Sequence, residues 1–99
     1  MSVRLSNSGD TLIAFLSGEI DHHAAAEMRF FIDGELERST PHLIIFDFTG
    51  VEFMDSSGIG LILGRIRVIS GWGGKASIQN PRPAIRKMLT LAGLEKLIK

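Results

Sequence analysis

The 99-residue sequence contains no cysteine, which excludes disulfides, thiolate catalysis and cysteine metal sites together. It also lacks an excess of charge of either sign, because eleven Lys and Arg balance eleven Asp and Glu. A neutral chain has no overall positive field that would hold nucleic acid or an anionic membrane. We therefore expect no direct contact with nucleic acid or membrane, and any partner must be recognised by a local surface.

Long apolar runs are missing as well. Residues 1–5 do not have the pattern of a signal peptide, and no segment approaches the roughly 20 apolar residues of a membrane span. Together with the lack of cysteine, this pattern predicts a soluble, cytoplasmic protein.

What the sequence does contain is enough apolar material for a core. Hydrophobic residues make up 44% of the chain and charged residues 22%, which is typical of a globular protein and not of a disordered one. We find no linker, repeat or low-complexity segment. Residues 1–99 are therefore expected to form one domain.

The N-terminal segment has the pattern of a hairpin. Residues 3–5 and 11–16 are its two arms, and the polar residues 7–10 form the turn between them. Both faces of the second arm carry apolar residues, so we expect an interior strand, ended by Gly18, in a sheet with helices packed around it.

A helix and a buried strand are predicted next. Asp21 can accept the free N–H groups at the start of a helix over residues 22–38. The apolar stripe of this helix consists of Met28, Phe31, Ile32 and Leu36. Residues 43–48 are almost continuously apolar, as in an interior strand covered on both faces.

The rest of the chain predicts two more helices and one more strand. Apolar residues recur at helical spacing after position 57 and would face the sheet: Ile59, Ile62, Leu63, Ile66 and Ile69. Arg65 and Arg67 fall outside this stripe. Residues 75–79 form a short strand, and Pro83 and Gly93 mark the two ends of the last helix. The order β-β-α-β-α-β-α predicts an α/β fold with a mixed central sheet packed with helices.

The most informative stretch is residues 47–60, in which a strand runs through a short turn onto Ser56 and Ser57 at the start of a helix. A hydroxyl there lies beside free backbone N–H groups and the positive end of the helix dipole, so a phosphate would be tolerated. A competing interpretation is that Asp55 or Ser56 only caps the helix. Neither serine has the Gly-x-Ser-x-Gly setting of a hydrolase nucleophile, so catalysis is not expected.

Two other candidate sites are weaker. Residues 71–75 are rich in glycine, but they lack the spacing of a phosphate-binding loop and lie between a helix and a strand. His22, His23 and His42 make a poor metal site, because adjacent residues on a helix point about 100° apart. We expect no metal and no cofactor.

Two motifs, FMDSSGIG at residues 53–60 and LSGEIDHH at residues 16–23, carry a family resemblance. The chain resembles STAS domains, and among them the bacterial anti-sigma factor antagonists (anti-anti-sigma factors) of the sporulation type. The resemblance covers essentially all 99 residues.

This resemblance implies a phosphoprotein switch in transcription regulation, not an enzyme. An anti-sigma factor that is also a serine kinase would phosphorylate Ser56, the first serine of the motif, and would supply the ATP. The unphosphorylated chain would bind this kinase and release the sigma factor, and a serine phosphatase would reset the phosphorylated form. The implied partner-binding residues are Asp21, His22, Asp55, Ser57, Gly58 and Ile59.

Energies indicate where such a switch would act. An exposed phosphate gains only about 0.3–1 kcal/mol from a helix dipole, too little to refold a domain. An unpaired phosphate buried against a partner costs several kcal/mol, so the switch is expected at the interface. Gly58 and Gly60 would let a partner approach the backbone closely.

Two alternatives remain open at this point. The chain could be a small nucleotide-binding domain that uses the serine turn as a phosphate cradle. It could also be a STAS scaffold in a stress-signalling complex, which would differ in its partner and not in its chemistry.

Overall fold

Four strands and three helices follow one another along residues 2–99, the part of the chain that the computed structural model describes. The strands are β1 (Val3–Ser8), β2 (Thr11–Ile20), β3 (Leu43–Met54) and β4 (Lys75–Gln79). The helices are α1 (His22–Ser39), α2 (Ser56–Ser70) and α3 (Pro83–Leu91), and a short 3-10 helix, η1 (Glu95–Leu97), comes last. The predicted α/β class and element order are confirmed.

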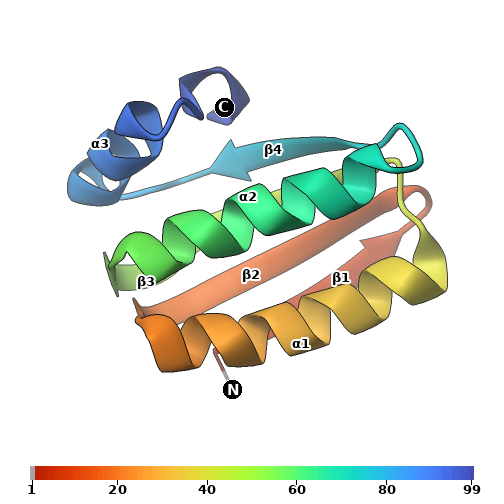
Figure 1. Ribbon diagram of the computed structural model, residues 1–99, viewed down its shortest axis with the longest axis horizontal. Helices are drawn as coiled ribbons and strands as arrows, with labels where there is room; N and C mark the ends of the chain where they lie inside the picture. The colour runs from red at the N-terminus through yellow and green to blue at the C-terminus, as the bar shows by residue number, and fades with distance from the viewer. Residues whose placement is uncertain (1) are drawn as a thin grey trace.

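The strands form one mixed sheet in the order β1-β2-β3-β4. β1 and β2 are an antiparallel hairpin, whereas β2 pairs with β3, and β3 with β4, in parallel. Because parallel neighbours need a crossover, α1 and α2 return the chain to the same end of the sheet. Figure 1 shows these two helices side by side in front of the sheet, with their N-termini at the same end.

The core lies between the sheet and the α1–α2 layer, where α1 packs on β2 and α2 packs on β3 and β4. The largest fully buried side chains are Phe46, Phe48, Leu12, Leu16, Ile20, Met28, Ile32, Leu36, Ile44, Ile62, Ile69 and Ile78. Alternate residues of β2 and β3 supply the sheet side of this core, as the period of a strand requires.

The opposite face of the sheet is less covered than expected. Ile13 and Phe15 of β2 and Ile45 of β3 are only half-buried there, and the Arg4 guanidinium lies 4.1 Å from the centre of the Phe15 ring. The prediction that both faces are covered is therefore wrong for this face. Apolar residues on both sides of a strand indicate an interior position in the sheet, but they do not distinguish a full layer from partial cover.

Three residues on the helix faces are placed differently from the prediction. Phe31 and Leu63, assigned to buried stripes, are 37% and 40% exposed, while Arg65, assigned outside the stripe, is only 4% exposed. The physical reason is that α2 contacts α1 as well as the sheet. Its buried arc is rotated toward α1, where the Arg65 Nε lies 2.7 Å from the Asp33 Oδ1.

β2 and β3 both continue further than predicted. Gly18 does not end β2, but adopts φ +80° at an irregularity in the pairing, after which β2 reaches Ile20. β3 likewise continues to Met54 in place of the expected turn. Ile20 and Met54 are consequently paired, and each is followed by a helix.

The C-terminal helix follows the prediction. α3 begins at Pro83, Gly93 has a left-handed φ of +86°, and the Leu94 N–H donates to the Leu89 carbonyl at 3.0 Å. Leu94 is buried, as a helix that ends on a left-handed glycine favours. Across residues 2–99, every helix is too short or too polar to span a bilayer.

Candidate functional site

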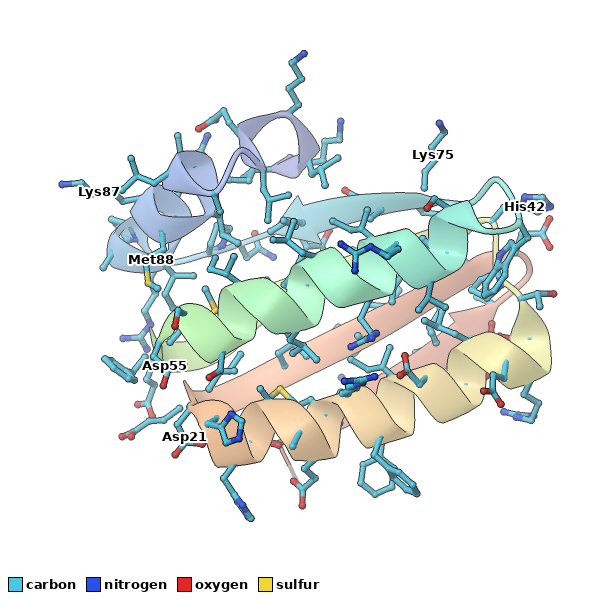
Figure 2. All side chains as sticks on the ribbon, viewed as in Figure 1. Asp21, His42, Asp55, Lys75, Lys87 and Met88 are labelled. Atoms are coloured by element: carbon cyan, nitrogen blue, oxygen red, sulfur yellow. The ribbon has the colours of Figure 1, made fainter. Side chains whose placement is uncertain are left out.

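Two aspartates cap the two parallel helices at the same edge of the sheet. The Asp21 carboxylate accepts a hydrogen bond from the Ala24 N–H at 2.8 Å, and the Asp55 carboxylate accepts one from the Ser57 N–H, also at 2.8 Å. The Asp55 N–H in turn donates to the Ile20 carbonyl at 3.1 Å, which ties one helix start to the other. Figure 2 shows Asp21 and Asp55 at the neighbouring ends of α1 and α2.

The serine pair occupies the first turn of α2. Asp55 is the capping residue, which decides between the two capping candidates, Asp55 and Ser56. Ser56 is exposed and Ser57 is half-buried, and neither hydroxyl makes a hydrogen bond within residues 2–99. The Ser56 hydroxyl is therefore free of a structural role and accessible to a modifying enzyme.

Gly58 has a different role from the one predicted. It is buried, and a Cβ added there would lie 2.2 Å from the Met54 Cγ and 3.3 Å from the Ile20 Cγ2. The missing side chain thus lets α2 pack on the ends of β2 and β3, and it does not open the backbone to a partner. Gly60 is exposed and has free space around it, so it fits the predicted close approach.

The segments on either side of the serine pair carry partly exposed apolar side chains. Phe53 is 54% exposed, Leu63 is 40% exposed, and Ile59 and Met88 are half-buried. Figure 2 places Met88 at the same end of the molecule as Asp55. Phe53 was missed as a surface residue, although adjacent residues of a strand face opposite sides, so Phe53 and Met54 could not both enter the core.

The same edge carries negative charge. Glu19 and Phe53 are paired at the ends of β2 and β3, and Glu19, Asp21 and Glu52 are exposed while Asp55 is half-buried. A phosphate on Ser56 would add about −1.5 to −2 charges to this acidic edge. A partner surface that accommodates the unmodified hydroxyl but supplies no cation would then bind this edge less well.

The histidines do not form a site together. His22 and His23 are exposed at the start of α1, and His42 lies at the other end of the molecule (Figure 2). No cluster of three or more metal-ligating side chains occurs among residues 2–99. The poor metal geometry expected from the sequence agrees with this placement.

Asp47 is a buried carboxylate of β3 that connects this strand to the end of β4. It accepts hydrogen bonds from the Thr49 N–H at 2.9 Å, the Gln79 Nε2 at 2.8 Å and the Asn80 Nδ2 at 3.1 Å. Desolvation raises the pKa of Asp47, but the hydrogen bonds from Thr49 and Gln79 outweigh it, so the pKa lies below its ordinary value. The bonds from Gln79 and Asn80 hold the end of β4 and the residue after it against β3.

Comparison with known proteins defines the class. The sequence model of the STAS domain family matches residues 2–99, so the chain belongs to the STAS domain family. The "Anti-sigma F factor antagonist" of Lysinibacillus sphaericus is 40% identical over 85 residues, which are 86% of this chain and 73% of that protein. Within the STAS family, the chain therefore groups with the anti-sigma F factor antagonists, which are regulatory proteins and not enzymes.

Two solved structures support the same grouping. The unphosphorylated anti-sigma factor antagonist SpoIIAA is 35% identical, with a TM-score of 0.89 over 98% of this chain and 85% of SpoIIAA. The phosphorylated form of the Bacillus cell fate determinant SpoIIAA is also 35% identical, with a TM-score of 0.82 over 98% of this chain and 88% of that chain. The phosphorylated and unphosphorylated states thus both occur in a relative with this fold.

Proposed function

We propose that this chain binds an anti-sigma factor with serine kinase activity, and that phosphorylation of Ser56 ends the binding. The unphosphorylated form releases a sigma factor for sporulation transcription, and a serine phosphatase restores that form. Because sigma factors act on RNA polymerase, we place the protein in the cytoplasm.

The observation that carries this proposal is the position of Ser56. Its side chain is exposed on the first turn of α2, and Asp55 already caps the helix through the Ser57 N–H. A kinase can therefore phosphorylate the Ser56 hydroxyl without breaking a hydrogen bond of the folded protein. The existence of a phosphorylated relative supports the same assignment.

The partner surface is proposed to include Asp21, His22, Asp55, Ser57 and Ile59, which the parallel pairing of β2 and β3 brings to one edge. Gly58 contributes by allowing α2 to pack closely on Met54. Phe53, near the end of β3, adds exposed apolar area to this edge. An exposed aromatic side chain at such an edge fits a protein partner.

Phosphorylation is proposed to act on binding and to leave the fold unchanged. The helix dipole stabilises an exposed phosphate by only about 0.3–1 kcal/mol. A loss of 2.7 kcal/mol of binding free energy already weakens a complex about a hundredfold, and an unpaired phosphate at an interface costs at least that much.

The first prediction tests the site. When the protein is mixed with its cognate anti-sigma kinase and ATP, we expect phosphate on Ser56 in the wild type and none on Ser56→Ala, which retains binding. Ser57→Ala is the matched control and should still be phosphorylated. Mass spectrometry that finds the phosphate on Ser57, or on the Ser56→Ala protein, would refute the assignment.

The nucleotide-binding alternative is not favoured. The Asp55 carboxylate occupies the Ser57 N–H that a phosphate cradle would need, and it adds negative charge next to the cradle.

A further inference from the structure

A groove runs between α1 and α2 on the outer side of the helix layer, with a volume of about 600 Å³. Small residues form its floor, namely Ala25 and Ala26 of α1 and Gly60 and Gly64 of α2. A Cβ added at Gly60 or Gly64 would meet no atom within 4 Å. The open space therefore reaches down to the backbone of α2. We call this feature the α1–α2 groove.

The α1–α2 groove concentrates positive charge in an otherwise neutral chain. Arg29, Arg65 and Arg67 line it, and no Asp or Glu is among its lining residues. Asp33 pairs with both Arg29 and Arg65, at 3.5 Å and 2.7 Å, so one carboxylate faces two guanidinium groups. The Arg67 side chain is exposed and makes no ion pair within residues 2–99. A net positive charge is left along the groove.

Arg65 is almost fully buried beside the groove, and its N–H donors are only partly used within the described residues. This residue is only 4% exposed, and its Nε lies 2.7 Å from the Asp33 Oδ1 without the geometry of a hydrogen bond. Its Nη1 reaches the Leu61 carbonyl at 3.5 Å, and its Nη2 donates to no group in the described chain. A guanidinium has five N–H donors, and burying such donors without acceptors is unfavourable.

One end of the α1–α2 groove meets the proposed partner surface. His22 and Ser57 line that end, and they directly follow Asp21 and Ser56 in the chain. From Ser57 to Val68 the groove follows α2 for about 16 Å, enough for about five residues of extended chain. A partner bound to the proposed partner surface can therefore extend along the groove.

We propose that the α1–α2 groove binds an acidic segment of the anti-sigma factor, whose carboxylates pair with Arg29, Arg65 and Arg67. This inference rests on the proposed function, because it assumes that partner. No Phe, Tyr or Trp side chain lines the groove to stack on a base, so a peptide fits it better than a nucleotide.

The second prediction tests the charge of the groove. Arg29→Glu with Arg67→Glu should weaken binding of the cognate anti-sigma factor at least tenfold at low salt, mainly through a slower association rate, and much less at high salt. Lys75→Glu with Lys96→Glu makes the same charge change at exposed positions outside the groove and should leave the affinity within about twofold. Figure 2 shows Lys75 pointing away from α1 and α2.

A steric variant tests the same groove without changing its charge. Gly64→Gln should fill the groove and lower the affinity about tenfold, while the helix gains a better helix former. Gly34→Gln is the matched control, since Gly34 is an exposed helical glycine outside the groove. Thermal unfolding confirms that each variant is folded.

The outcomes separate the two levels of the proposal. If the wild type does not bind the anti-sigma factor, the proposed function fails. If it binds and Ser56 phosphorylation ends binding, but the groove variants behave like wild type, only the groove assignment fails. Calorimetry with ATP and no partner adds a further outcome. If ATP binds the wild type but not the variant with Arg29→Glu and Arg67→Glu, the groove binds a nucleotide and the peptide assignment is wrong.

Discussion

At the scale of single residues, Gly58 and Asp47 each fix one contact between elements of the fold. Gly58 allows α2 to lie directly on Met54, since a Cβ there would be 2.2 Å from the Met54 Cγ. Asp47 holds Gln79 and Asn80 beside β3 through its carboxylate. Gly58 therefore fixes how the start of α2 packs, whereas Asp47 fixes the end of β4 against β3.

The third prediction concerns Asp47 and pH. The pKa of Asp47 is lowered in the folded protein, so its contribution to stability is present above the unfolded pKa, about 3.9, and is lost as the pH falls through the lower folded value. Asp47→Asn should lower the free energy of unfolding by about 1–3 kcal/mol at pH 7. The difference from wild type should shrink below pH 3.9.

Urea unfolding of both proteins at neutral and acidic pH measures this effect. Asp10→Asn is the control, because Asp10 is exposed in the turn between β1 and β2. A wild-type advantage that stays constant down to pH 2 would show that the Asp47 charge contributes nothing.

At the scale of elements, α1 and α2 start at the same edge of the sheet because β2 and β3 are parallel and their last residues, Ile20 and Met54, are paired. Each helix starts on an aspartate with extended backbone and a carboxylate bonded to the helix N–H groups. The two positive helix ends therefore lie side by side, and Asp21 and Asp55 partly offset them. This pairing of helix starts forms the candidate site.

The fourth prediction compares the two caps. Asp21→Ala and Asp55→Ala each remove one capping hydrogen bond, so each should lower the free energy of unfolding by about 1 kcal/mol. Asp21→Asn and Asp55→Asn keep a capping oxygen and should stay near wild type. Urea denaturation provides the comparison, and an alanine variant as stable as its asparagine counterpart would contradict the capping role.

At the scale of the whole molecule, charge is separated although the chain is neutral. The ends of β2 and β3 carry Glu19, Asp21, Glu52 and Asp55, while the α1–α2 groove carries three arginines. Arg65 and Asp33 join the two crossover helices across this layer. Desolvation outweighs the nearby Asp33 carboxylate, so the pKa of Arg65 lies below its ordinary value.

The fifth prediction uses this pair in a double-mutant cycle. Asp33→Ala leaves the Arg65 guanidinium buried without its carboxylate and should lower the free energy of unfolding by about 1–3 kcal/mol. Adding Arg65→Met to Asp33→Ala should recover part of that loss, because the buried charge is gone. If the double variant unfolds more easily than Asp33→Ala, the pair does not act as described.

Much of the fold was predictable because its signals are local. The hairpin, the Asp21 cap, Pro83 and Gly93 depend on immediate neighbours, and the structure confirms each of them. The predicted turn at residues 7–10 is too long, because β1 continues to Ser8 and only residues 9–10 form the turn. The burial of helix faces was less predictable. Arg65 is buried and Leu63 is exposed, the reverse of the prediction, because α2 packs on α1 as well as on the sheet.

The candidate site was predictable in part. The motif around Ser56 indicated a helix start, but it did not show that Asp55 alone caps the helix or that Gly58 faces the core. Phe53 was missed, although strand alternation with the buried Met54 would have placed it on the other face of the sheet.

The sequence by itself determined the element order, the Asp21 cap and the serine pair, because these follow from residues a few positions apart. Only the tertiary structure decided that Asp21 and Asp55 lie at one edge, that Arg65 is buried and that a basic groove adjoins Ser57. These features depend on the parallel pairing of β2 with β3 and on the contact between their crossover helices. Residues far apart in the chain meet there, and no local pattern encodes such a meeting.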